Sequence, residues 1–307
     1  MANNVKLSSL ISISCFFYDM INMVIKMQNA FDNEIKYKLF RTIREILHPT
    51  ISKKNISDYK IIIDESILPV RIFYPKKVTG IDKIIIYIHG NPNVTNCNGN
   101  YSNICKKLSI KTNRLVIAPE YKERKHKVED VYKEIYNTIK YIYIRLEENG
   151  INPENIALVG DSTGGNIITG INYLNKQEIP IKKEVLFYPT LSLEYFDKSK
   201  FLSISKNVGF NLTLQNSLKD YFSYIAYKKD LKKELLNPLD HSNNIIPDTL
   251  IIVGKVDCLI DECAEYYKKL KKGNHKYLEL PFSSHGFLKK MDSETEKEVL
   301  EEVNNFL

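Results

Sequence analysis

Residues 155–174 read "NIALVGDSTGGNIITGINYL", and this stretch decides the fold. The apolar run 156–159 is typical of a buried strand, and the apolar residues of 167–174 recur at helical spacing. Between them, Gly160 and Gly164 flank Ser162, which predicts a sharp strand-to-helix turn with the serine hydroxyl exposed as a nucleophile. A lone GxSxG is a weak signal, and a phosphate-binding or purely structural glycine turn is the alternative. The strand before it and the helix after it favour the nucleophile.

The same alternation of strands and helices continues on both sides of this stretch. Short runs rich in β-branched residues occur at 59–64, 68–74, 83–88, 114–118, 155–159, 184–188, 249–254 and 276–280. Helical spacing marks 127–148, and the last stretch, "DSETEKEVLEEVNNFL", begins with an Asp/Ser capping signal. The first two runs are too close for a crossover helix, so they should form an antiparallel hairpin at a sheet edge. The sequence therefore predicts an α/β protein with a mostly parallel, eight-stranded sheet flanked by helices.

Two segments depart from this alternation. Residues 190–246 contain no convincing parallel strand, are rich in Phe, Tyr and Leu, and fit a helical cap inserted between core segments 51–189 and 247–307. Residues 1–50 predict N-terminal helices that form part of the cap. Residues 7–25 are apolar, but their apolar positions step by three and four, which favours an amphipathic helix. A membrane anchor or an export signal remains the alternative for that stretch.

The composition argues against some classes of protein. The 307 residues carry a net charge of +7 from lysines scattered along the chain, without the basic block that nucleic-acid binding would need. Five cysteines at irregular spacing argue against a disulfide framework, and together with the lack of an export signal they predict a cytoplasmic protein. We expect no nucleic-acid partner, and a homodimer stays possible.

A serine nucleophile needs a base and an acid that orients it. His285, in "LELPFSSHGFL", directly follows the last predicted strand and is the expected base. Asp257 follows the preceding strand within reach of an imidazole and is the expected acid. Asp261 and Glu262 are nearby alternatives, but Asp261 better suits a cap for the helix that begins there.

Taken together, these motifs resemble the hormone-sensitive-lipase family of α/β-hydrolase esterases from about residue 60 to the C-terminus. The resemblance is carried by "YIHGNPN" (87–93), "APE" (118–120), "GDSTGG" (160–165), and "GKVDCLIDE" (254–262) followed by "HGF". It implies the α/β-hydrolase fold and hydrolysis of a small-molecule carboxylic ester through an acyl-enzyme, with neither metal nor cofactor. It also implies that Asp161 and Glu120 support the turn around Ser162 rather than react.

The oxyanion hole departs from the family pattern. The resemblance places its donors at Asn91, Pro92 and Thr163, with Gly90 in the same loop, but proline has no N–H. Losing one donor can cost ~100- to 1000-fold in turnover. His-Gly-X-Pro is a variant known in other α/β-hydrolases, so we expect a rearranged oxyanion hole formed by Asn91, Thr163 and Gly90, in which the N–H groups of Asn91 and Thr163 are the two main donors.

The sequence leaves two alternatives to a serine esterase of small to medium acyl esters. One is an amide or formamide hydrolase that uses the same Ser162, His285 and Asp257. The other is a non-catalytic ligand-binding protein on a hydrolase scaffold, which the proline keeps open. A serine-directed phosphonate probe separates these classes.

Overall fold

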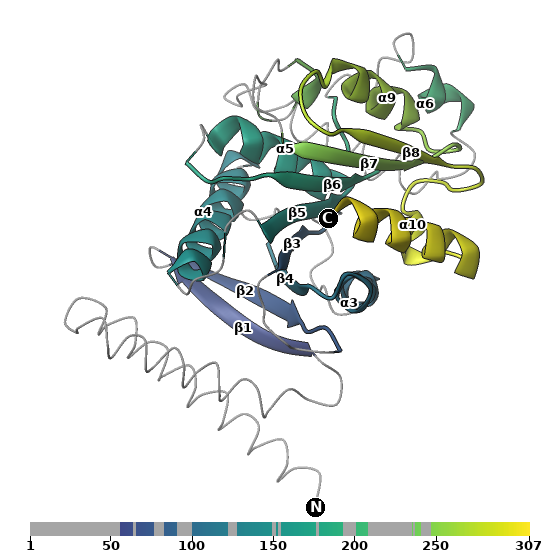
Figure 1. The fold of residues 1–307 in the computed structure, drawn as a ribbon. Coiled ribbons are helices and arrows are strands. Elements are labelled where there is room, and N and C mark those ends of the chain that lie inside the picture. The colour runs from purple at the N-terminus through teal and green to yellow at the C-terminus, as the bar shows by residue number, and fades with distance from the viewer. Residues whose placement is uncertain are drawn as a thin grey trace, which may run out of the picture. The chain divides into compact units, whose positions relative to one another are not determined.

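A computed structural model describes residues 56–63, 66–76, 83–90, 100–121, 128–148, 152, 155–175, 178–192, 201–207, 235, 237–240 and 247–307. All of them belong to the part of the chain from Asn55 to Leu307. Within it, eight strands form one sheet in the order β1-β2-β4-β3-β5-β6-β7-β8 (Figure 1). The strands are β1 (Ile56–Ile63), β2 (Ser66–Phe73), β3 (Ile84–Ile88), β4 (Leu115–Pro119), β5 (Ile156–Asp161), β6 (Lys183–Phe187), β7 (Asp248–Gly254) and β8 (Lys276–Leu280). The predicted eight-stranded sheet is confirmed.

The strand pairing also matches the prediction. β1 and β2 form an antiparallel hairpin at one edge, and β2 pairs antiparallel with β4. All remaining pairs, from β4 through β3, β5, β6 and β7 to β8, are parallel. Parallel strands covered on both faces read as continuous apolar runs, and β3, "IIIYI", is buried at all five positions.

Helices cover both faces of this sheet. The α-helices are α3 (Asn100–Thr112), α4 (Val128–Glu147), α5 (Thr163–Asn175), α6 (Leu202–Lys206), α9 (Ile260–Lys269) and α10 (Ser293–Phe306), and the short 3₁₀ turns are η4 (Pro238–Asp240) and η5 (Phe287–Lys289). In Figure 1, α3 and α10 lie together on one face, and α4 and α5 lie on the other. The predicted stripe of α4 is buried at Val131, Ile135 and Ile139. The Asp292 side chain accepts hydrogen bonds from the N–H groups of Glu294 and Thr295, so the predicted N-terminal capping residue of α10 is confirmed.

The helical cap that the sequence predicts over the core, from residues 1–50 and 190–246, is described only in part. Residues 1–50 lie outside the described residues, and of 190–246 only 190–192, 201–207, 235 and 237–240 are described. These include α6 and η4 and contain no strand. The proposed division into core and cap therefore remains a prediction.

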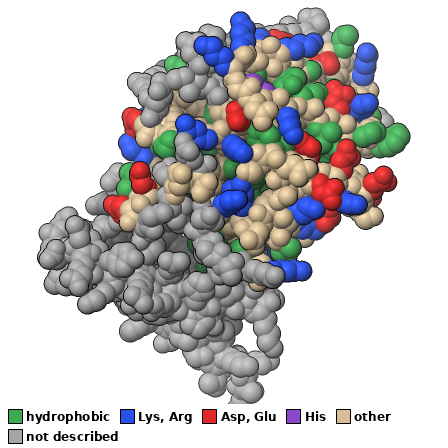
Figure 2. Space-filling view, viewed as in Figure 1, with side chains coloured by type: hydrophobic (Ala, Val, Ile, Leu, Met, Phe, Trp, Pro, Cys, Tyr) green, Lys and Arg blue, Asp and Glu red, His purple; other side chains and the backbone are tan. Residues whose placement is uncertain are grey.

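The surface of the described part is mixed in charge. On the face shown in Figure 2, Lys and Arg side chains are interspersed with Asp and Glu side chains. Among the described residues, none of the helices combines the length and the hydropathy of a membrane span.

Candidate active site

Ser162 occupies the tight turn between β5 and α5. Its φ of 52° lies in the left-handed region, which is uncommon for a residue with a side chain. A Cβ at position 164 would lie 2.1 Å from the carbonyl oxygen of Ile88, and one at position 160 would lie 2.9 Å from the same oxygen. The two flanking glycines are therefore required by close packing. The predicted strand, sharp turn and helix are all present.

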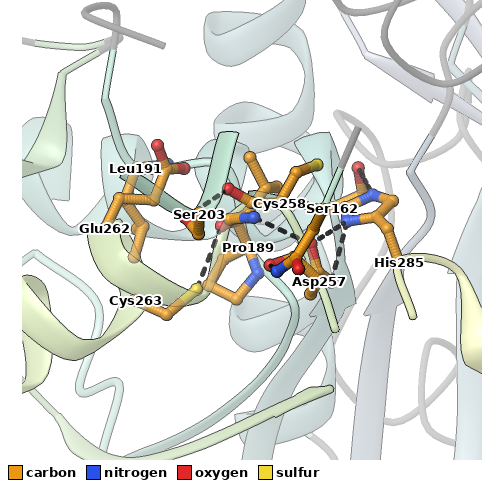
Figure 3. A network of polar contacts seen from close by, with 11 residues as sticks. Ser162, Pro189, Leu191, Ser203, Asp257, Cys258, Glu262, Cys263 and His285 are labelled. Carbon is orange, nitrogen blue, oxygen red and sulfur yellow. Dashed lines mark hydrogen bonds and ion pairs between the residues drawn. The ribbon is translucent and has the colours of Figure 1, made fainter. Parts of the chain in front are cut away.

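Ser162, His285 and Asp257 come together from three loops that follow β5, β8 and β7 (Figure 3). The Oγ atom of Ser162 lies 3.0 Å from Nε2 of His285. The Nδ1 atom of His285 lies 3.1 Å from each carboxylate oxygen of Asp257. All three residues are buried, and Asp257 is fully so. This is the order and spacing in which a carboxylate orients an imidazole toward a serine hydroxyl.

Backbone contacts hold the acid and base loops together. The N–H of Lys255 donates to the carbonyl of Leu280 at 2.9 Å, and the N–H of Val256 donates to that of Ser283 at 3.2 Å. A Cβ on Gly254 would lie 1.9 Å from the Ser283 carbonyl oxygen, so only glycine permits this approach. The main chain thus fixes the two loops that carry Asp257 and His285 against each other.

Asp161 connects the serine turn to the loop after β3. Its Oδ1 accepts hydrogen bonds from the Tyr87 hydroxyl at 2.8 Å and from the Gly90 N–H at 2.9 Å. Burial raises the pKa of Asp161, and these two hydrogen bonds oppose that rise. The prediction that Asp161 supports the turn agrees with this geometry. Glu120 is different, because among the described residues only its backbone N–H is seen to bond, to the carbonyl of Pro69 at 2.8 Å.

The Gly90 N–H is therefore already engaged. A Cβ at Gly90 would lie 2.5 Å from the Asp161 carbonyl oxygen and 2.9 Å from Cβ of Ser162. Gly90 is thus a close-packed residue beside the serine, and its predicted place among the oxyanion donors does not fit this arrangement. Asn91 and Pro92 lie outside the described residues. Thr163 opens α5, where the backbone N–H groups of the first turn are not used by the helix itself.

Two tyrosines that the sequence patterns did not indicate hold the loop after β3. The Tyr101 hydroxyl donates to the carbonyl of Gly90 at 2.6 Å, and the Tyr121 hydroxyl donates to that of His89. The His89 ring stacks on both, with centroids 5.0 Å from Tyr101 and 4.4 Å from Tyr121. Burial lowers the pKa of His89 to about 4, so its ring is neutral near pH 7. These contacts fix the peptide groups that lead into the predicted oxyanion loop.

The two alternative acids have other partners. The sequence position of Asp261 suggested that it caps α9, and this prediction is wrong. Helix α9 begins at Ile260, and the residue before it, Leu259, makes no side-chain capping hydrogen bond. Instead, Oδ2 of Asp261 accepts the N–H of Ser203, in the first turn of α6, at 2.7 Å. Oε1 of Glu262 accepts the N–H of Leu191 at 2.8 Å, and burial raises the pKa of this carboxyl well above its usual range. Neither is paired with His285 in the described structure.

The comparisons with known proteins agree with this architecture. The sequence model of a family described as alpha/beta hydrolase fold matches residues 85–289, which is about two thirds of the chain. The chain belongs to this family. Among the solved structures, this hydrolase is similar to a hyperthermophilic esterase from the archaeon Pyrobaculum calidifontis, with a TM-score of 0.72 and 20% sequence identity over 90% of each chain. At that identity the likeness concerns the fold alone.

Several relatives detectable by sequence are named esterases or deacetylases. The hydrolase is 26% identical over 247 residues to an arylesterase from Saccharolobus solfataricus, covering 75% of this chain and 77% of that protein. It is 27% identical over 205 residues to an arylacetamide deacetylase from Bos taurus, covering 61% of this chain and 51% of that protein. The resemblance to hormone-sensitive-lipase-like esterases is thereby confirmed at the level of the family.

Proposed function

We propose that this hydrolase cleaves small to medium acyl carboxylic esters through an acyl-enzyme on Ser162, with His285 as general base and Asp257 as the orienting acid. The observation that carries the proposal is the pair of contacts of the His285 ring: Nε2 at 3.0 Å from Ser162 Oγ and Nδ1 at 3.1 Å from the Asp257 carboxylate. The family and the named relatives support the same reaction class.

In the acylation half, Ser162 Oγ attacks the carbonyl carbon of the ester while Nε2 of His285 takes the hydroxyl proton. Asp257 accepts the hydrogen bond from Nδ1–H, which keeps Nε2 unprotonated before attack and stabilises the imidazolium afterwards. The tetrahedral intermediate then collapses, the bond from carbon to the leaving oxygen breaks, and His285 returns the proton to the departing alcohol.

In the deacylation half, a water molecule loses a proton to His285 and attacks the acyl carbon. The bond to Ser162 Oγ breaks, the proton passes back to the serine, and the carboxylic acid leaves. In both halves the developing negative oxygen requires N–H donors. On sequence grounds these are Thr163 and Asn91, in a two-donor hole shaped by Pro92.

The substrate class follows from the reaction and from the relatives' names. Neither half-reaction draws on a metal or a cofactor, because the nucleophile, base and acid are all side chains of the chain. An arylesterase and an arylacetamide deacetylase differ in the bond that their names specify, ester against amide. Aryl esters are therefore the first substrates to test, and aryl acetamides are the comparison. The cytoplasmic location and a possible homodimer stay predictions from the sequence.

The test is hydrolysis of p-nitrophenyl esters with acyl chains of two to twelve carbons, measured for wild type, Ser162→Ala and Pro92→Gly. We expect turnover that is greatest for shorter chains and is abolished in Ser162→Ala. The Pro92→Gly rate shows whether a third donor limits catalysis. An active wild type on p-nitroacetanilide but not on any ester would assign the amide reaction instead. Wild type no faster than Ser162→Ala on either class would refute hydrolysis and leave the ligand-binding alternative.

A further inference from the structure

The acid loop, residues 257–262, is held by hydrogen bonds from outside the parallel sheet and its crossover helices. Three of them come from α6 and from Asn207, the residue that follows it, within the predicted helical cap segment. The side-chain amide of Asn207 donates to the carbonyl oxygen of Asp257 at 2.8 Å. The Ser203 hydroxyl donates to the carbonyl oxygen of Cys258 at 2.8 Å, and the Ser203 N–H donates to Oδ2 of Asp261 at 2.7 Å. Figure 3 shows Ser203 beside Cys258, next to the Asp257–His285 pair.

The hydrogen bond from Ser203 to Cys258 is buried, and those from Asn207 to Asp257 and from Ser203 to Asp261 are partly buried. Asp257 is fully buried, Cys258 is 4% exposed and Ser203 is 3% exposed. Within its own loop, the Asp257 carbonyl receives only a long hydrogen bond, from the Ile260 N–H at 3.4 Å, so the Asn207 amide is its short partner among the described residues. A buried carbonyl that loses its donor stays desolvated, and the local backbone shifts to compensate.

The same loop is held at its other end by the start of the segment. The N–H of Leu191 donates to Oε1 of Glu262, which is buried. Both peptide oxygens at 257 and 258, and both carboxylates at 261 and 262, therefore bind residues between 191 and 207.

We propose that Asn207 and Ser203 are positioning residues for the reaction, holding the Asp257 peptide so that its carboxylate stays aligned with Nδ1 of His285. This inference rests on the proposed function for its kinetic consequence. It assigns α6 a role in setting the geometry of the acid, in addition to any contact that the cap segment makes with substrate. Misplacement of a catalytic group by about 1 Å can cost ~100-fold in rate, so a partial shift should cost about 10-fold.

The test compares four variants with wild type on p-nitrophenyl acetate and on p-nitrophenyl octanoate. Asn207→Asp keeps the shape but replaces the donor by an oxygen that faces the Asp257 carbonyl oxygen, while Asn207→Ala removes the group. Ser203→Ala removes the second donor and serves if the Asn207 variants do not fold. Lys206→Ala, an exposed change on the same helix, is the matched control.

We expect kcat to fall about 10-fold in Asn207→Asp, Asn207→Ala and Ser203→Ala, by the same factor for both esters and with KM unchanged. Lys206→Ala should match wild type. A loss confined to octanoate, or a rise in KM alone, would mean contact with the acyl chain and would overturn the positioning role. Folded variants that differ from wild type only in thermal midpoint would overturn it as well.

A second measurement is independent of turnover. The Nδ1 proton of His285 in the His–Asp hydrogen bond should give a far-downfield proton resonance, to be identified by its loss in His285→Ala. The resonance should move or broaden in Asn207→Ala and remain in place in Lys206→Ala. An unmoved resonance in a folded Asn207→Ala protein would refute the inference even if no ester is hydrolysed. Failure of the esterase assay in wild type, with the resonance shifted, would refute only the proposed function.

Discussion

Glu184 offers a prediction that depends on a single buried carboxyl. It lies on β6, in register with Leu158 of β5 and Thr249 of β7, and is fully buried. The side-chain amide of Asn172 donates to Oε2 at 2.7 Å. The Thr249 hydroxyl lies 2.9 Å from Oε1 and 2.7 Å from the carbonyl oxygen of Pro247. Because a hydroxyl has one proton and a carbonyl only accepts, both Thr249 contacts are full hydrogen bonds only when Glu184 is protonated and donates.

The magnitude follows from the pKa. Burial raises the pKa of Glu184 from its ordinary value of 4.5 to about 7, while the hydrogen bonds that Asn172 and Thr249 can donate to the ionised carboxylate oppose the rise. Between these values the folded protein binds a proton that the unfolded chain has released, so the free energy of unfolding falls as pH rises through this window. The full difference corresponds to about 3 kcal/mol. The loss of unfolding free energy that comes from ionising buried Glu184 is absent below pH 4.5 and complete above pH 7.

The perturbation is Glu184→Gln. The glutamine carbonyl can accept from Asn172 and its amide can donate to Thr249, so the network of the protonated state is kept without a titrating group. Urea unfolding of wild type and variant from about pH 4 to about pH 9 gives the difference in unfolding free energy, in which other titrating groups cancel. We expect the unfolding free energy of the variant to rise relative to that of wild type by about 3 kcal/mol across this pH range. Parallel stability curves would refute the buried protonated carboxyl.

Three further predictions concern packing and capping. Gly254→Ala should lower both turnover and unfolding free energy, because its Cβ would overlap the Ser283 carbonyl, and a kinetic and urea-unfolding comparison with wild type checks this. Tyr87→Phe should cost about 1–3 kcal/mol of unfolding free energy, because buried Asp161 loses a donor; an unchanged urea midpoint would contradict it. Asp292→Ala should lower the thermal midpoint by removing the cap of α10, more at pH 7 than at pH 2. The pKa of Asp292 is lowered by its hydrogen bonds to Thr295, so its stabilisation is lost as pH falls through that pKa; the same loss at both pH values would exclude the ionised cap.

The sheet and the serine turn were predictable because their signals are local. An apolar run such as β3 reports its burial on both faces, and Gly160 and Gly164 report the tight turn between them. His285 and Asp257 could also be predicted, since each follows a strand end in the order that the motif requires. Position along the chain was enough for these residues because parallel strands bring their carboxyl ends to one edge.

Contacts between segments far apart in sequence were not predictable in the same way. The Tyr121 hydroxyl reaches His89 across 32 residues, and the Asn207 amide reaches Asp257 across 50. A single side chain that binds a distant carbonyl leaves no periodic pattern. Asp261 illustrates the error that results: its place near the start of a helix suggested a cap for α9, whereas it binds the N–H of Ser203 in α6.

The proposed reaction requires that His285 activates Ser162 as a nucleophile. Its most direct test is the intact mass of the protein after reaction with a fluorophosphonate, followed by peptide mapping, for wild type, Ser162→Ala and His285→Ala. We expect one adduct in wild type, located on Ser162, no adduct in Ser162→Ala, and much slower labelling in His285→Ala. An unlabelled wild type, or labelling that is as fast without His285, would contradict it.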